Sequence, residues 1–168
     1  GPDYLLVDGY NIIFAWPELQ PVARDNLDAA RKMLLDILAN YRAFRGGEII
    51  LVFDAYKVKG NPGSLEKAEG VYVAYTKEAQ TADAYIERAT YDLARQHRVR
   101  VATSDGPEQL IILGHGALRL SALQLRQEIE QARGQISALL AAQWGPKSGS
   151  QTMKQALERA QKEKEDKK

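Results

Sequence analysis

The sequence predicts an α/β fold with a mainly parallel sheet, and three observations indicate that class. Apolar runs of strand length occur at residues 4–7 and 48–53, and such runs are typical of strands buried on both faces. Segments with apolar residues at three- and four-residue steps alternate with these runs, and that spacing predicts helices. Aspartates follow the strands, at the positions where an α/β sheet commonly carries its ligands. Strands alternating with helical segments favour parallel β-α-β units.

The first half of the chain contains three predicted strands and one long helix. Residues 4–7 form the first strand, and residues 26–44 form a helix with one apolar face and Asp25 as a candidate cap for its first turn. The continuous apolar run 48–53 predicts a buried parallel strand. Residues 71–75 alternate between apolar and polar and are expected nearer an edge of the sheet.

The second half continues the alternation. Residues 81–96 have helical periodicity, residues 99–103 form a further strand, and residues 107–113 form a short helix with Pro107 in its first turn. Residues 121–140 form the clearest long helix, because Ser121 and Gln124 make a capping-box pattern before an apolar face. The order strand, helix, two strands, helix, strand, helix is therefore predicted.

Composition divides the chain into one domain at residues 3–144 and a linker with a charged tail at residues 145–168. The linker is rich in Gly and Ser, and the segment beyond it becomes a Lys/Glu run that we expect to fray or to be disordered unless a partner holds it. Residues 55–70 are expected to form a long loop that overhangs the end of the strand at 48–53.

The charge is unevenly distributed, although the net charge is only +1. Residues 1–118 carry 13 Lys and Arg against 16 Asp and Glu, whereas residues 119–168 carry 10 against 6. A basic segment beside an acidic site suits a nuclease, because phosphates are attracted by it; a solvated helical surface is the alternative. Cysteine is absent, and neither a membrane span nor a secretory signal is visible, so a cytoplasmic protein is expected.

Four aspartates are the candidate catalytic residues: Asp8, Asp54, Asp83 and Asp105. Asp8, Asp54 and Asp105 follow predicted strands, and Asp83 begins a helix. Because the carboxyl ends of parallel strands share one edge of a sheet, we expect the four carboxylates to converge. Carboxylates brought together repel one another unless a proton or a cation intervenes, and Mg²⁺ prefers such oxygen ligands. The pattern predicts a metal-dependent enzyme acting on phosphate esters.

Polar residues near these aspartates are candidate supporting groups. Gly9 permits a sharp turn after Asp8, so that Asn11 can direct its amide toward a metal or a ligand oxygen, or form a local turn. Thr103 and Ser104 are candidate hydrogen-bond donors to a carboxylate or a phosphate. The candidate substrate-binding residues are basic and flank the acidic site: Lys57, Lys59 and Arg119. With only two histidines, neither close to these aspartates in sequence, a histidine general base and a zinc hydrolase are disfavoured.

The chain resembles the NYN domains of the PIN-like nuclease superfamily, and more narrowly their YacP-like branch. The motifs that carry the resemblance are Val7-Asp8-Gly9-Tyr10-Asn11, Phe53-Asp54, Thr81-Ala82-Asp83 and Thr103-Ser104-Asp105. The similarity covers roughly residues 4–140. It implies a Rossmann-like three-layer sandwich with helices on both faces of the sheet.

The resemblance also implies an activity, a metal and partners. It implies an endoribonuclease dependent on Mg²⁺ or Mn²⁺, in which Asp8, Asp83 and Asp105 bind the metal, Asp54 completes the acidic cluster and Asn11 supports it. In the YacP-like branch it further implies a bacterial enzyme that associates with the ribosome and cuts mRNA during translation. Two alternatives remain: a non-catalytic RNA- or ribosome-binding module of the same fold, and a metal-dependent phosphohydrolase for small substrates.

Overall fold

The computed structural model describes residues 1–55, 59–104, 116–144 and 153–166. Its strands are β1 (Tyr4–Asp8), β2 (Glu48–Phe53), β3 (Ser64–Ala68), β4 (Val71–Tyr75), β5 (Val99–Ala102) and β6 (Leu118–Leu120). Its helices are α1 (Gly9–Ala15), α2 (Gln20–Asp25), α3 (Leu27–Arg45), α4 (Ala82–Leu93), α6 (Ala122–Trp144) and α7 (Met153–Asp166). Two compact units are formed, residues 1–128 and residues 129–168, and the first contains every strand of the sheet.

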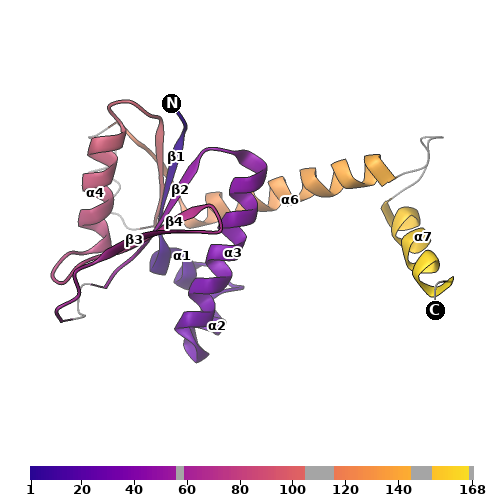
Figure 1. Cartoon of the computed structure of the whole chain (residues 1–168), viewed down its shortest axis with the longest axis horizontal. Helices are drawn as coiled ribbons and strands as arrows, with labels where there is room; N and C mark the ends of the chain where they lie inside the picture. The colour runs from indigo at the N-terminus through magenta and orange to yellow at the C-terminus, as the bar shows by residue number, and fades with distance from the viewer. Residues whose placement is uncertain (56–58, 105–115, 145–152, 167–168) are drawn as a thin grey trace. The chain divides into compact units, whose positions relative to one another are not determined.

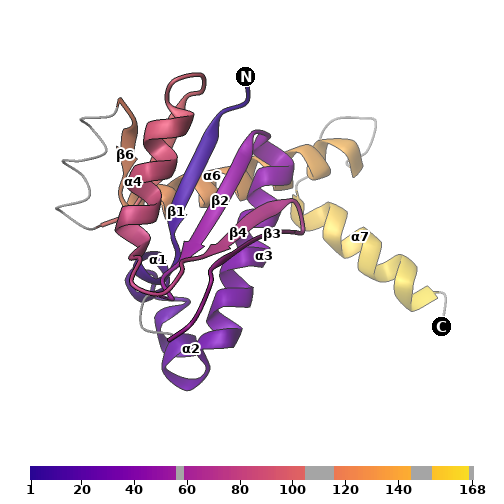
Figure 2. The same ribbon diagram turned by 60° about the vertical axis from the view of Figure 1, so that its left-hand side comes forward.

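The sheet has six strands in the order β3-β4-β2-β1-β5-β6. Every neighbouring pair is parallel except β3 with β4, which is antiparallel. Helix α4 contacts β1, β2 and β5, whereas α3 contacts β2 and β4, and the two helices lie on opposite faces of the sheet (Figures 1 and 2). The predicted α/β sandwich with a mainly parallel sheet and helices on both faces is therefore confirmed.

The core follows the two-residue periodicity of the strands. Leu6, Val52 and Val101 belong to a buried cluster that includes Ile86 of α4, so these strand positions face α4. The intervening positions, such as Leu51, are also buried and face the opposite layer. Burial of each such side chain contributes about 1.5–3 kcal/mol to folding. Because helices cover both faces of the sheet, the sequences of the central strands are continuous apolar runs and do not alternate between apolar and polar residues.

Helix α3 confirms the helix predicted at residues 26–44, but its cap differs from the prediction. The backbone N–H of Ala29 donates to Oδ1 of Asn26 at 3.1 Å, whereas Asp25 is the last residue of α2. Either residue type can cap a helix. Helix α2 determines which of the two caps α3. Asp25 is the last helical residue of α2, so the extended backbone of a cap falls on Asn26. Gly46, with φ of +82°, ends α3.

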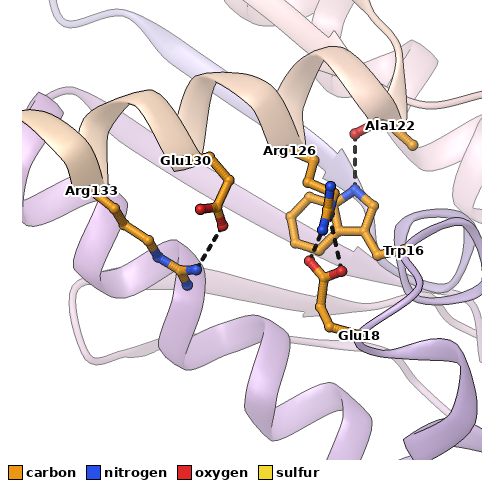
Figure 3. Close-up of polar contacts among 6 residues, drawn as sticks. All are labelled: Trp16, Glu18, Ala122, Arg126, Glu130 and Arg133. Atoms are coloured by element: carbon orange, nitrogen blue, oxygen red, sulfur yellow. Dashed lines mark hydrogen bonds and ion pairs between the residues drawn. The ribbon is translucent and has the colours of Figure 1, made fainter.

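The start of α6 is fixed by contacts distant in sequence. The backbone N–H of Ser121 donates to Gln124 at 2.8 Å, and the backbone N–H of Gln124 donates to the Ser121 hydroxyl at 3.1 Å, which confirms the capping box. The buried indole N–H of Trp16 donates to the carbonyl of Ala122 at 2.8 Å (Figure 3). Arg126 donates to both carboxylate oxygens of Glu18, each at 3.0 Å (Figure 3). These contacts hold the first turns of α6 beside the segment that follows α1.

A charged network joins α3, β5 and α6. Glu128 accepts from the Tyr41 hydroxyl at 2.9 Å and from the Arg100 guanidinium at 2.7 Å. Burial alone would raise the pKa of Glu128, but the hydrogen bonds from Arg100 and Tyr41 outweigh it and lower that pKa below its ordinary value. Burial and the same carboxylate raise the pKa of Tyr41. We call Trp16, Tyr41, Arg100, Ala122 and Glu128 the α6 anchor.

Several elements depart from the sequence-based prediction. Helices α1 and α2 and strands β3 and β6 were not predicted, and β3 lies inside the segment 55–70 that was predicted to be a loop. The tail predicted to fray contains α7. The helix predicted at residues 107–113 lies outside the described residues, and the predicted domain boundary at residue 144 stays a prediction. No helix within the described part of the chain has the length and apolar character needed to cross a membrane.

Candidate active site

Asp8 is the last residue of β1 and only 8 % exposed. Asp8 pairs in register with Val52 and is two residues beyond Leu6. Because alternate strand positions share a face, Asp8 lies on the same α4 face of the sheet as Leu6 and Val52. A carboxylate is costly to bury unless charge or hydrogen bonding compensates it. Asp8 lies at the carboxyl end of the central parallel strands, where ligands of α/β sheets bind, and this position makes it a candidate for function.

Asp54 follows β2, and the N-terminus of α4 lies against it. The backbone N–H of Ala82 donates to Oδ2 of Asp54 at 3.3 Å, and Asp83 is the next residue in the first turn of that helix. Thr81 caps the helix by accepting from the N–H of Ala84 at 3.1 Å. The positive end of a helix dipole stabilises nearby carboxylates. The start of α4 therefore brings Asp83 to the same edge of the sheet as Asp54.

Asn11 connects α1 to the segment after β5. Its Oδ1 accepts the backbone N–H of Ser104 at 2.7 Å, so this oxygen holds two loops together. Thr103 is fully buried, and its backbone N–H donates to the carbonyl of Leu120 at 2.9 Å. These bonds fix the backbone that leads to residue 105. Whether Asn11, Thr103 and Ser104 also support catalysis stays a prediction.

Gly9 is required by a close approach rather than by a turn. It begins α1 directly after Asp8, and a β-carbon there would lie 2.4 Å from the Phe53 ring and 2.9 Å from the carbonyl oxygen of Val52. Such distances exclude a side chain without movement of β2. The absence of a side chain lets the start of α1 pack against β2, and this packing places Asp8 beside the segment that carries Asp54.

Thr76 is a candidate supporting residue that the sequence analysis missed. It follows β4 and is fully buried. Its hydroxyl accepts the backbone N–H of Ala55 at 2.8 Å, and its own N–H donates to the carbonyl of Phe53 at 3.0 Å. It therefore fixes the backbone on both sides of Asp54. Its position directly after the predicted strand 71–75 could have indicated this role. A threonine at the end of a buried strand can form hydrogen bonds to the backbone at the end of the neighbouring strand.

The remaining predicted residues are only partly described. Asp105 and Lys57 lie outside the described residues. Lys59 is exposed in a turn at the start of the described segment 59–104. Arg119 is half-buried in β6 opposite Val101. The structure thus brings Asp8, Asp54 and Asp83 to one edge of the sheet together with Asn11 and Ser104, through strand register and hydrogen bonds. Convergence of all four aspartates stays a prediction.

The donor chemistry at this edge fits a hard divalent cation. All three described aspartates offer carboxylate oxygens, which Mg²⁺ and Mn²⁺ prefer. Within residues 1–55, 59–104, 116–144 and 153–166, no group of three or more histidine, cysteine or acidic side chains is arranged to hold a metal ion. The described carboxylates therefore supply suitable oxygens but not a complete ligand set.

Comparisons with known proteins match most of the chain. The family model described as the YacP-like NYN domain matches residues 5–167. A protein described as uncharacterized protein YacP, from Bacillus subtilis (strain 168), is 44 % identical over 140 residues, which are 80 % of this chain and 79 % of that protein.

Solved structures agree with the sequence comparisons. The crystal structure of a tryptophan-to-leucine mutant of Rae1 (YacP) from Bacillus subtilis has a TM-score of 0.73 and 38 % identity, with 86 % of this chain and 85 % of that chain covered. A crystal structure of Rae1 (YacP) from the same organism has a TM-score of 0.70 and 39 % identity, with 83 % and 80 % covered. The residues matched by the family model, 5–167, include Asp8, Asp54 and Asp83.

Proposed function

Because the chain belongs to the YacP-like NYN domain family, a family of nuclease-type domains, we propose that it is a metal-dependent endoribonuclease. The observation that supports this function best is the shared position of Asp8, Asp54 and Asp83 at the carboxyl edge of the sheet. Ligands of open α/β sheets bind at this edge. The substrate we propose is mRNA on translating ribosomes in the bacterial cytoplasm.

In this proposal the metal ligands are Asp8, Asp83 and Asp105, with Asp54 completing the acidic cluster. A bound Mg²⁺ or Mn²⁺ would neutralise charge on the scissile phosphate and make an attacking water more acidic. The protein contributes the positions of the carboxylates. Asn11 and Thr76 hold the strand ends through bonds to Ser104 and Ala55, and such fixed geometry lowers the cost of reaching the transition state.

Substrate binding requires positive charge outside the acidic cluster. Lys57, Lys59 and Arg119 are proposed to contact phosphates of RNA. The overall net charge of +1 predicts weak binding to free RNA, because non-specific affinity comes mainly from neutralised phosphates. A ribosome that holds both the enzyme and the message would raise their effective concentration. We therefore propose that ribosome-engaged RNA is cut faster than naked RNA.

The test compares wild type, Asp83→Asn and Asp92→Asn on one transcript, naked and under active translation. Each protein is assayed with Mg²⁺, with Mn²⁺ and with EDTA. Asp92 is a matched control, because it lies on the same helix, is 60 % exposed and pairs with Arg88. We expect Asp83→Asn and EDTA to abolish cleavage and Asp92→Asn to retain it.

Two outcomes would contradict parts of the proposal. Cleavage by Asp83→Asn at the wild-type rate would remove Asp83 from the catalytic set, and full activity in EDTA would remove the metal. Ribosome or RNA binding without cleavage under any condition would favour the non-catalytic module. Equal rates on naked and translated transcript would exclude ribosome dependence while leaving the nuclease intact.

A further inference from the structure

Three aromatic rings form a row across the carboxyl ends of neighbouring elements. The Tyr10 and Phe53 ring centroids are 5.0 Å apart, and the Phe53 and Tyr75 centroids are 5.5 Å apart. Phe53 and Tyr75 are paired in register on β2 and β4, whereas Tyr10 comes from α1. Phe53 is 1 % exposed and forms the floor of the row, and the two tyrosines are only half-buried. Two tyrosines therefore remain partly accessible beside a fixed phenylalanine.

A cavity of about 290 Å³ opens beside this row, between α3 and the sheet. Phe53, Tyr75 and Val73 line it from the sheet, and Leu35 lines it from α3. This volume lies just below the range of about 300–1,000 Å³ that is typical of ligand sites. The cavity is therefore suited to a flat group smaller than most drug-sized ligands.

The charges around the cavity balance. Arg31 and Lys32 line it together with Asp28, and Glu66 is close enough to influence Tyr75. Arg31 is paired with Asp28 and donates to the Tyr10 hydroxyl at 2.9 Å. Burial raises the pKa of Tyr75, although the charge of Arg31 opposes this effect, so the phenol stays neutral at physiological pH. A balanced rim with an aromatic wall suits an uncharged planar ring with polar edges better than it suits a phosphate.

The cavity is adjacent to the proposed catalytic edge. Phe53 directly precedes Asp54 in the chain, and Gly9, next to Asp8, packs against the Phe53 ring. Successive positions of a strand point to opposite faces. One backbone segment therefore presents Asp54 toward α4 and Phe53 toward the cavity beside α3, so that an RNA strand crossing the sheet edge would reach both.

We propose that this cavity is a nucleobase subsite, in which one base of the RNA strand next to the cut stacks on Tyr75. This assignment rests on the proposed ribonuclease function. Unpaired bases in RNA are commonly held by stacking on aromatic side chains and by hydrogen bonds to their edges. The carboxylate of Asp28 and the guanidinium of Arg31 are the polar groups available for the base edge.

The test is a binding titration that needs no catalysis. A single-stranded trinucleotide RNA is added to the full-length protein in EDTA, and NMR shifts of the Tyr75 ring and the Leu35 methyl groups are followed. We expect saturable shifts at both residues. Tyr75→Ala should weaken binding by about 5- to 150-fold, which corresponds to about 1–3 kcal/mol for a stacked base, whereas Tyr75→Phe should retain it.

Two further variants keep the result interpretable. Tyr91→Ala removes a tyrosine that is 52 % exposed on α4 and should bind as wild type does. Leu35→Trp fills the cavity from α3 without altering the aromatic row and should weaken binding as Tyr75→Ala does. Wild-type affinity in Leu35→Trp, or no shift at Leu35, would overturn the subsite. Binding at Leu35 by a protein that never cleaves RNA would overturn the nuclease and retain the subsite.

Discussion

The carboxyl edge of the sheet and the α6 anchor use charged residues in opposite ways. In the anchor, the Glu128 carboxylate accepts hydrogen bonds from Arg100 at 2.7 Å and from Tyr41 at 2.9 Å. At the carboxyl edge, Asp8, Asp54 and Asp83 carry like charge, and backbone N–H groups donate there to the side chains of Asp54, Asn11 and Thr76. Like charges held together oppose folding unless a cation joins them. The anchor thus pairs its charges in a way that stabilises the fold, whereas the edge carries like charge that the proposed metal would neutralise.

The largest predicted effect is on the anchor. Trp16→Ala should lower the free energy of unfolding by about 3–5 kcal/mol, because it removes a fully packed ring and leaves a cavity. It also leaves the Ala122 carbonyl without its indole donor. Urea unfolding measures the change, and Trp16→Phe, which keeps most of the ring volume, should lose much less. The cleavage rate per folded molecule should stay near wild type. A rate loss equal to that of an aspartate variant would contradict the assignment of the anchor to stability alone.

The next effect is on the edge. Asp8→Asn should lower the cleavage rate by about 10²–10³-fold, the usual cost of removing one group that stabilises charge in a transition state. Its melting temperature in EDTA should equal or exceed that of wild type, because a like charge has been removed. Calorimetry and single-turnover cleavage on the same preparation measure both quantities. A fall of several degrees with unchanged rate would identify Asp8 as a structural residue.

A smaller effect tests the pH dependence of the anchor. Glu128→Gln should cost about 1–2 kcal/mol at neutral pH, because hydrogen bonds to charged groups are lost at a site that is partly exposed to solvent. The folded-state pKa of Glu128 lies below the ordinary value of 4.5. The contribution of the Glu128 carboxylate to the free energy of unfolding is therefore fully present above pH 4.5 and disappears as the pH falls through the folded-state pKa.

Glu130→Gln is the matched control for this variant. Glu130 lies on the same helix, pairs with Arg133 and is 52 % exposed (Figure 3), so its loss should cost less than about 0.5 kcal/mol. Urea unfolding of both variants from neutral to acidic pH gives the comparison. A difference between Glu128→Gln and wild type that persists unchanged in acid would show that the carboxylate charge is not responsible.

The smallest effect concerns charge around the edge. The triple variant Lys57→Ala/Lys59→Ala/Arg119→Ala should weaken RNA binding and reduce the slope of log affinity against log salt by about 0.7 for each phosphate that is no longer neutralised, the value for single strands. Binding is measured with the Asp83→Asn protein as background, so that no substrate is cut. Unchanged affinity and slope would place the phosphate-binding residues elsewhere.

The sequence predicted the parts of the fold whose signals are local. The apolar run at Glu48–Phe53 and the capping box at Ser121 need no distant partner to be recognised. Helix α1 was missed because Gly9 indicates a turn in the sequence, whereas the close approach of Phe53 that requires a glycine there comes from a distant segment. Strand β3 was missed because Ser64–Ala68 is almost entirely exposed and lacks an apolar alternation.

For the site, the sequence predicted where the aspartates lie along the chain but not how they are held. The rule for parallel strand ends placed Asp8 at the end of β1 and Asp54 directly after β2, as the structure has them, whereas their catalytic role stays a prediction. The bond from Asp54 to the α4 N-terminus and the bonds of Thr76 depend on strand order, and no local pattern encodes the order β3-β4-β2-β1-β5-β6. The row of Tyr10, Phe53 and Tyr75 was invisible for the same reason, since its members come from three separated segments.

The position of β1 has a consequence for how the protein is made. It is the first strand in the sequence, yet it lies between β2 and β5, so its two edges are completed only by residues 48–52 and 99–102. Contacts of such long range slow folding, and the N-terminal part of a chain emerges first during synthesis. A nascent chain that ends before Val99 carries Asp8, Asp54 and Asp83, but one edge of β1 is unpaired and Asn11 lacks Ser104. If the proposed activity holds, competence to cleave RNA should therefore arise only after residues 99–104 have been added.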